Sequence, residues 1–230
     1  MKVALFGSAW VLYVLLALSV RSVGVVFERA VFFYRDGRRG GEALHRGLHQ
    51  KLKAGDEEGA NELLRESGTV EGGVVARALA FREGGAASFA DALDSELSRA
   101  KNTLEKGTTF LGTVGSNAPF IGLFGTVIGV IQAFHELGSA AARAGQMGSV
   151  MSGISEALVA TGVGIFVAIP AVIAFNICQK RISDIERNAF SLGHLVAAWI
   201  LLQEHRGERP SAARIERAVL EAAASLAAPE

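Results

Sequence analysis

Residues 117–130 read NAPFIGLFGTVIGV, an almost wholly apolar stretch that carries three glycines and a proline. Each glycine weakens a helix by about 1 kcal/mol relative to alanine, so a soluble helical core rarely concentrates them. The stretch lies in an uncharged run from Gly107 to Phe134, and a membrane-spanning helix takes about 20 mainly apolar residues. Small side chains let helices approach closely in a bilayer. We therefore expect a membrane-spanning helix packed against another helix.

Two further segments are long and apolar enough to span a bilayer: VALFGSAWVLYVLLALSV at residues 3–20, and the uncharged run from Ala157 to Cys178. The composition agrees, because half of the 230 residues are hydrophobic and the mean hydropathy is +0.32. A formal net charge of zero gives no sign of a nucleic-acid partner. The single cysteine, Cys178, excludes an internal disulfide framework and suggests an inert thiol.

The first apolar segment has an alternative interpretation as a cleaved signal peptide. Lys2 precedes its apolar core, and Ala17, Leu18 and Ser19 resemble a cleavage site. We favour a membrane span, because the apolar pattern continues past Arg21 and two more spans follow. Arg21 itself interrupts the segment, and we expect it to face a neighbouring helix or the inner membrane interface.

The distribution of lysine and arginine predicts the orientation. Twelve basic residues lie between the first and second spans and seven follow the third, whereas the short segment between the second and third spans holds only Arg143. Cytoplasmic segments are the ones enriched in these residues. We therefore predict an all-α polytopic membrane protein with the N-terminus outside and two spans extended into the cytoplasm as long helices. Its predicted parts are a first transmembrane helix (1–34), a cytoplasmic helical region (35–106), a second transmembrane helix (107–137), a periplasmic loop (138–150), a third transmembrane helix (151–178) and a cytoplasmic helical tail (179–230).

Glycines divide the predicted cytoplasmic region into helices. The leucine spacing from Gly41 to Glu66 is helical with an interruption near Gly55, and SGTVEGG at 67–73 breaks the pattern again. Ser88 resembles an N-cap, with Asp91 three residues later. No proline intervenes before Pro119, so we expect one helix from Ser88 to Leu137. ARIERAVLEAAASLAA at 213–228 predicts a last amphipathic helix.

Small residues gather on one face of each of the last two spans. At about 100° per residue they fall within arcs of about 80° and 100°. These residues are Gly115, Pro119, Gly122, Thr126 and Gly129 in the second span, and Gly153, Ala157, Ala160, Thr161, Gly164, Ala168 and Ala171 in the third. Such faces either pack two helices tightly together or line a pore between copies.

Glu156 is a candidate functional residue, because a carboxylate in a span costs roughly 2.5–3.5 kcal/mol unless it faces protein or water. Thr126 and Thr161 are predicted to lie at matching depths, about 15–16 Å below the outer end of their spans. Hydroxyls can relay a proton, and a carboxyl removed from water is more readily protonated. The three residues predict a proton path. The alternative is that Glu156 reaches lipid headgroups at the outer interface.

GSNAPFIGLFGTVIGVIQAF (115–134) and GISEALVATGVGIFVAIPAVIAFN (153–176) resemble the TolQ/ExbB/MotA proton-channel family, closest to the TolQ and ExbB branch. The resemblance implies a homopentamer in the bacterial inner membrane, around a single-span partner like ExbD or TolR that occupies the central pore. In the family, residues corresponding to Glu156, Thr161 and Thr126 line the path of protons. Pro119, Pro170 and Asn176 match its structural motif.

The resemblance implies a motor subunit that couples proton-motive force to protein or nutrient transport, envelope maintenance or gliding motility. The alternative function is a non-conducting membrane scaffold for a partner complex. An enzyme is not expected, because no nucleophile and base or metal set stands out, and no cofactor is predicted. His45 and His49 are spaced for a shared metal ion, but no further ligand accompanies them, and solvated helix faces are expected instead.

Overall fold

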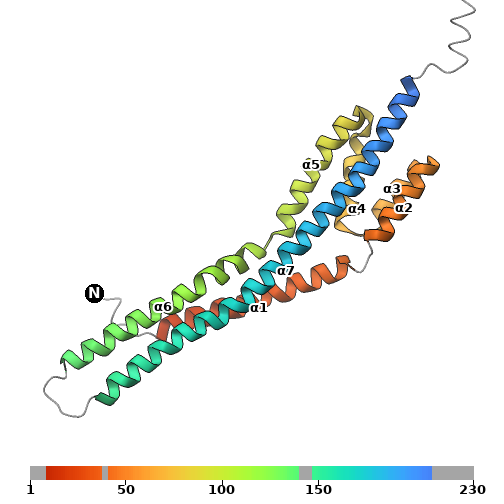
Figure 1. The fold of residues 1–230 in the computed structure, drawn as a ribbon. Helices are drawn as coiled ribbons and strands as arrows, with labels where there is room; N and C mark the ends of the chain where they lie inside the picture. Colours follow the sequence, from red (N-terminus) through yellow and green to blue (C-terminus); the bar gives the residue numbers. More distant parts are fainter. Residues whose placement is uncertain (1–8, 38–40, 140–146, 209–230) are drawn as a thin grey trace, which may run out of the picture. The chain divides into compact units, whose positions relative to one another are not determined.

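The computed structural model describes residues 9–37, 41–139 and 147–208, and within them every regular element is a helix. Figure 1 shows the helices in chain order. They are α1 (Ala9–Gly37), α2 (Gly41–Ala54), α3 (Glu57–Glu66), α4 (Val70–Ala78), the 3₁₀ helix η2 (Leu79–Gly84), α5 (Gly85–Leu104), α6 (Thr108–Ser139) and α7 (Met147–Glu208). Among them α1, α6 and α7 are long and apolar enough to cross a membrane. The all-α polytopic prediction is therefore confirmed.

The chain forms two compact units. The first contains α1, the end of α5, α6 and α7 as far as Asp184. The second contains α2, α3, α4, η2, most of α5 and the rest of α7. The predicted helix at 213–228, residues 1–8 and most of the predicted loop at 138–150 lie outside the described residues.

The core of the first unit is built from the facing sides of α1, α6 and α7, which run side by side (Figure 1). Its buried members are Val11, Leu15, Val114, Ala118, Val167, Ala168 and Ala171. Trp10 of α1 packs edge-on against Phe124 of α6, with ring centroids 6.2 Å apart. The Arg21 guanidinium lies 4.6 Å from the ring centroid of Phe110 in α6. This cation–π contact accommodates a charge in an otherwise apolar stretch.

The expectation of one helix from Ser88 to Leu137 is wrong. The helix ends at Leu104, and α6 begins at Thr108 after Gly107, which has a φ of 78°. A positive φ is easy for glycine alone. The break is stabilised from α1, where buried Arg29 donates from Nη1 to the carbonyl of Leu104 at 3.3 Å. A cation at a helix C-terminus also complements the helix dipole.

The predicted breaks in the second unit are confirmed. Gly55 and Gly68 have φ values of 74° and 58° and separate α2, α3 and α4. Asp56 caps α3 by accepting from the Gly59 N–H at 2.9 Å, and Thr69 caps α4 by accepting from the Gly72 N–H at 3.1 Å. Leucines of α2 and α3 pack with α4, α5 and α7 in one apolar core.

The predicted N-cap at Ser88 is wrong, because Ser88 lies inside α5. The helix starts at Gly85, which has a φ of 84°. Its first turn is capped from a distant part of the chain, since the Glu204 carboxylate of α7 accepts from the Ala86 N–H at 2.9 Å. A carboxylate at a helix N-terminus satisfies a free N–H and complements the helix dipole.

Candidate functional site

The backbones of α6 and α7 approach each other closely at two glycines. A Cβ on Gly122 would lie 2.6 Å from the Ala160 carbonyl oxygen, and a Cβ on Gly164 would lie 2.6 Å from that of Ala118. Real Cβ atoms essentially never come within 3.0 Å of another heavy atom. The two backbones are therefore in direct contact, as expected where small residues drive helix association in a bilayer.

The small residues of the two spans are buried within a single chain. Those we identified for packing or for lining a pore are Gly115, Gly122, Gly129, Ala157, Ala160, Gly164 and Ala168, all of which are buried. Their burial within one chain agrees with a packing role.

Thr126 of α6 and Thr161 of α7 meet at this contact, and their hydroxyl groups are hydrogen-bonded to each other. Thr126 Oγ1 also lies 3.2 Å from the carbonyl oxygen of Ala157 and 3.3 Å from that of Gly122. Both threonines are half-buried. Residue spacing predicted that the two threonines lie at equal depths, and in the structure they are in direct contact. This contact requires the close approach of the two backbones at Gly122.

The threonine pair has the chemistry of a proton relay. A hydroxyl is one donor and two acceptors, so either threonine of this pair can donate to the other. The carbonyl oxygens beside Thr126 accept its hydrogen when Thr161 donates. To relay a proton, such a hydroxyl must accept a proton on its oxygen from one side while it gives its own hydrogen to an acceptor on the other side, and this needs no backbone movement.

Glu156 does not join the threonines within one chain. It precedes Thr161 by five residues on α7, which places it about 140° away around the helix. Its side chain is exposed, and within the described residues it makes no hydrogen bond or ion pair. The sequence predicted that the Glu156 carboxyl and the Thr126 and Thr161 hydroxyls would converge. Within one chain only the two hydroxyls do. The Glu156 carboxyl therefore lies on the outer surface of the single chain.

The remaining motif residues are spread along the two helices. Pro119 lies inside α6 and Pro170 inside α7, where each removes one backbone donor from its helix. The Asn176 side chain is exposed and makes no hydrogen bond to other described residues. The structure therefore brings none of these three to the threonine pair.

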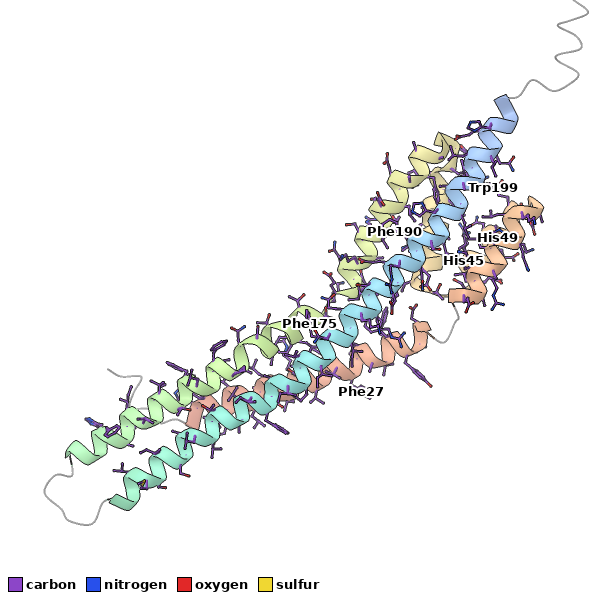
Figure 2. The ribbon with its side chains drawn as sticks, viewed as in Figure 1. Phe27, His45, His49, Phe175, Phe190 and Trp199 are labelled. Atoms are coloured by element: carbon purple, nitrogen blue, oxygen red, sulfur yellow. The ribbon has the colours of Figure 1, made fainter. Side chains whose placement is uncertain are left out.

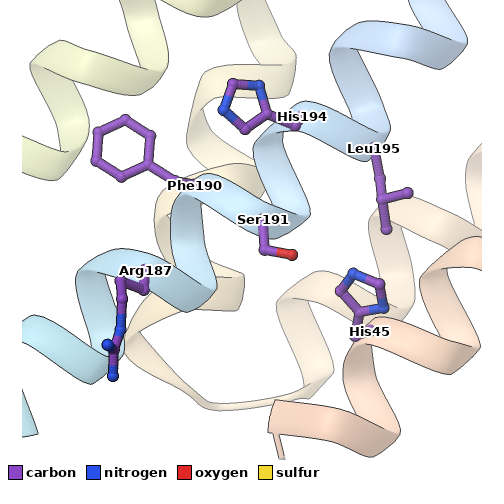
Figure 3. Close-up of a pocket in the computed structure, with 6 residues that line it drawn as sticks. All are labelled: His45, Arg187, Phe190, Ser191, His194 and Leu195. Carbon is purple, nitrogen blue, oxygen red and sulfur yellow. The ribbon is translucent and has the colours of Figure 1, made fainter.

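A shallow pocket of about 560 Å³ lies in the second unit, between α2 and α7. Figure 3 shows His45 of α2 on one side, with Arg187, Phe190, Ser191, His194 and Leu195 of α7 forming the rest. His49 lies on the same helix as His45 (Figure 2) but lines a different pocket, with Trp199. Within residues 9–37, 41–139 and 147–208, no three His, Cys, Asp or Glu side chains lie close enough to hold a metal ion.

The sequence reasoning missed a row of exposed polar side chains on α6, made by Thr113, Ser116 and Asn117. The signal was present, because these positions follow a helical spacing inside an uncharged run.

Comparison with known proteins gives a family and several relatives. The sequence profile of the MotA/TolQ/ExbB proton channel family matches residues 47–189. The Tol-Pal system protein TolQ of Haemophilus influenzae is 45% identical over 97 residues, which are 42% of this chain and 42% of that protein. TolQ of Pseudomonas aeruginosa is 46% identical over 92 residues, which are 40% of this chain and 39% of that protein.

A longer match is found with the biopolymer transport protein ExbB of Neisseria meningitidis serogroup A. It is 30% identical over an alignment of 210 residues, which covers 84% of this chain and 92% of that protein. The chain thus matches less than half the length of the two TolQ proteins and nearly the whole of this ExbB protein.

Proposed function

The chain belongs to the MotA/TolQ/ExbB proton channel family, and from this premise we propose that it is the proton-channel subunit of an inner-membrane motor. The motor couples the proton-motive force to work at the cell envelope. The observation that carries the proposal is the hydrogen-bonded pair of Thr126 and Thr161 at the seam between two membrane-spanning helices.

The proposed path uses one carboxyl and two hydroxyls. Glu156 takes up or releases the proton, because it is the carboxyl that lies closest along α7 to the threonine pair. Thr126 and Thr161 relay the proton at the seam between α6 and α7. A pair that can reverse its hydrogen bond supports transfer in either direction.

The proposed assembly is a homopentamer around a single-span partner that resembles ExbD or TolR. The exposed position of Glu156 supports it, since a carboxyl on a membrane span should face protein or water. In a ring of copies it faces either the next copy or the partner in the central pore. The basic residues flanking the spans support an outside N-terminus and a cytoplasmic C-terminal tail.

The proposal is tested by Glu156→Gln, which keeps the shape of the side chain and removes its titratable proton. The matched control is Glu58→Gln, an exposed glutamate on α3 outside the spans. Each variant is co-expressed with a single-span protein that resembles ExbD or TolR, and proton uptake by membrane vesicles is measured with the amount and size of the purified complex.

We expect Glu156→Gln to lower proton uptake by roughly tenfold or more, equivalent to a barrier increase of about 1.4 kcal/mol. The Glu58→Gln complex should conduct as the unmodified one does. Full uptake in an intact Glu156→Gln complex would refute the proposed role of Glu156 in the proton path. Absence of uptake by the intact unmodified complex would refute the channel proposal and favour the non-conducting scaffold.

A further inference from the structure

The exposed polar row on α6 consists of Thr113, Ser116 and Asn117, and all three lie on one side of a membrane-spanning helix. At about 100° per residue they share an arc of about 100°. Asn117 is 11 residues beyond Lys106, the last charge before the span, which is about 16 Å along the helix. The row therefore occupies the half of the span that begins at Lys106.

The donors of this row are used within α6. Thr113 Oγ1 donates to the Thr109 carbonyl at 2.9 Å, and Ser116 Oγ donates to the Gly112 carbonyl at 2.9 Å. Asn117 Nδ2 donates to the Thr113 carbonyl at 2.9 Å and to Ser116 Oγ at 3.1 Å. Within the described residues, the Asn117 amide oxygen Oδ1 accepts no hydrogen bond. The exposed side of the row thus presents hydrogen-bond acceptors, and its amide and hydroxyl hydrogens are already used in hydrogen bonds within α6.

Contact with lipid hydrocarbon is unfavourable for this polar surface. A single serine or threonine is tolerated in a membrane helix, because its hydroxyl bonds back to its own backbone. The Asn117 amide oxygen has no such partner among the described residues, and an unsatisfied polar group in hydrocarbon is strongly unfavourable. The same face of a second copy does not satisfy it either, since that face also offers only acceptors.

This face of α6 changes from polar to apolar at Phe120. Beyond it the same side of α6 is apolar and exposed, with Phe120, Phe124, Val127 and Ile131. Thr126 is nine residues from Asn117, which places it about 180° away around the helix. The polar row is thus separate from the threonine pair and ends at an aromatic side chain.

From this arrangement we propose that Thr113, Ser116 and Asn117 line a water-filled vestibule that opens at the Lys106 end of α6 and closes at Phe120. Water supplies the donors that the acceptors of the row require. The inference rests on the proposed topology for one point, that the open end is cytoplasmic. It goes beyond the proposed function, because it concerns a different face of α6 from the threonine pair.

The test measures the reactivity of single cysteines in the full chain, in membranes that contain the assembled complex. Cys178 is first changed to alanine, and Thr113→Cys and Ser116→Cys are introduced separately, both close in size to the original residue. The control is Val127→Cys, on the same exposed face beyond Phe120. Inside-out vesicles are treated with a membrane-impermeant cationic methanethiosulfonate, and labelling is normalised to that of the denatured protein.

We expect the Thr113→Cys and Ser116→Cys variants to react at least about tenfold faster than Val127→Cys, since a thiol ionises in water and not in an apolar environment. Reaction no faster than that of Val127→Cys would overturn the vestibule, whether lipid or a second copy covers the row. Fast reaction only in right-side-out vesicles would overturn the cytoplasmic opening. Proton uptake by the unmodified complex is measured in parallel vesicles, so absence of uptake there with the labelling gradient intact would count against the proposed function alone.

Discussion

Gly164 of α7 lies directly against Gly122 of α6. A Cβ built on Gly164 would lie 3.1 Å from the Gly122 Cα and 2.6 Å from the carbonyl oxygen of Ala118. Two residues away on the same helix, a Cβ on Gly162 would meet nothing within 4 Å. The two glycines therefore predict opposite responses to the same substitution.

Gly164→Ala should destabilise the protein by about 1–3 kcal/mol, because the added methyl group presses on backbone that cannot move aside without separating the helices. Gly162→Ala should be neutral or stabilise by up to about 1 kcal/mol through higher helix propensity. Thermal unfolding of the detergent-purified protein measures both. Equal effects of the two substitutions would contradict the close contact between α6 and α7.

Arg29 connects α1 to the end of α5. Its guanidinium is buried and donates to the Leu104 carbonyl at 3.3 Å. Arg29→Ala should lower the free energy of unfolding by about 1–3 kcal/mol, because it leaves a carbonyl of the broken helix without its partner. Arg35→Ala, at an exposed position on the same helix, is the control and should have little effect. Similar losses of thermal stability in both variants would show that the contact with Leu104 contributes nothing.

The ion pair between Arg77 and Glu96 in the second unit is expected to be sensitive to acid. The Arg77 Nε donates to its carboxylate at 2.5 Å and lowers the pKa of Glu96 below its ordinary value of 4.5. A carboxyl whose pKa is lower in the folded state stabilises the fold above the ordinary value. That stability is lost as the pH falls through the folded-state pKa.

Glu96→Gln should therefore reduce stability by about 0.5–1 kcal/mol near neutral pH and by less as the pH falls below 4.5. Unfolding temperatures of the two proteins across this pH range measure the difference. Asp91→Asn, an exposed change on the same helix, is the control and should give a pH-independent offset. A difference for Glu96→Gln that stays constant with pH would argue against the ion pair.

Local signals in the sequence were sufficient for much of the fold. The apolar runs predicted the helices that are long enough to span a membrane, and Gly55 and Gly68 predicted the ends of α2 and α3. Residue spacing also placed Thr126 and Thr161 at the same depth, which the hydrogen bond between them agrees with. Each of these features depends on helical periodicity or on the backbone freedom of glycine.

The features that the sequence did not predict depend on residues far apart in the chain. The break before α6 is stabilised by Arg29, 75 residues before Leu104. The start of α5 is capped by Glu204, 118 residues after Ala86. Nothing in the local sequence of either helix indicates these partners. The surroundings of Glu156 are likewise not predicted by the sequence, because its side chain is exposed and makes no hydrogen bond or ion pair within the described residues.

The most direct test of the account is the proton flux through complexes that lack the hydroxyl pair. Thr126→Val with Thr161→Val keeps the shape of both side chains and removes both hydroxyls, whereas Thr126→Ser with Thr161→Ser keeps the hydroxyls. Flux into proteoliposomes should fall by roughly tenfold or more in the valine complex, equivalent to about 1.4 kcal/mol, and stay near the original value in the serine complex. An assembled valine complex that conducts protons at the original rate would contradict the relay.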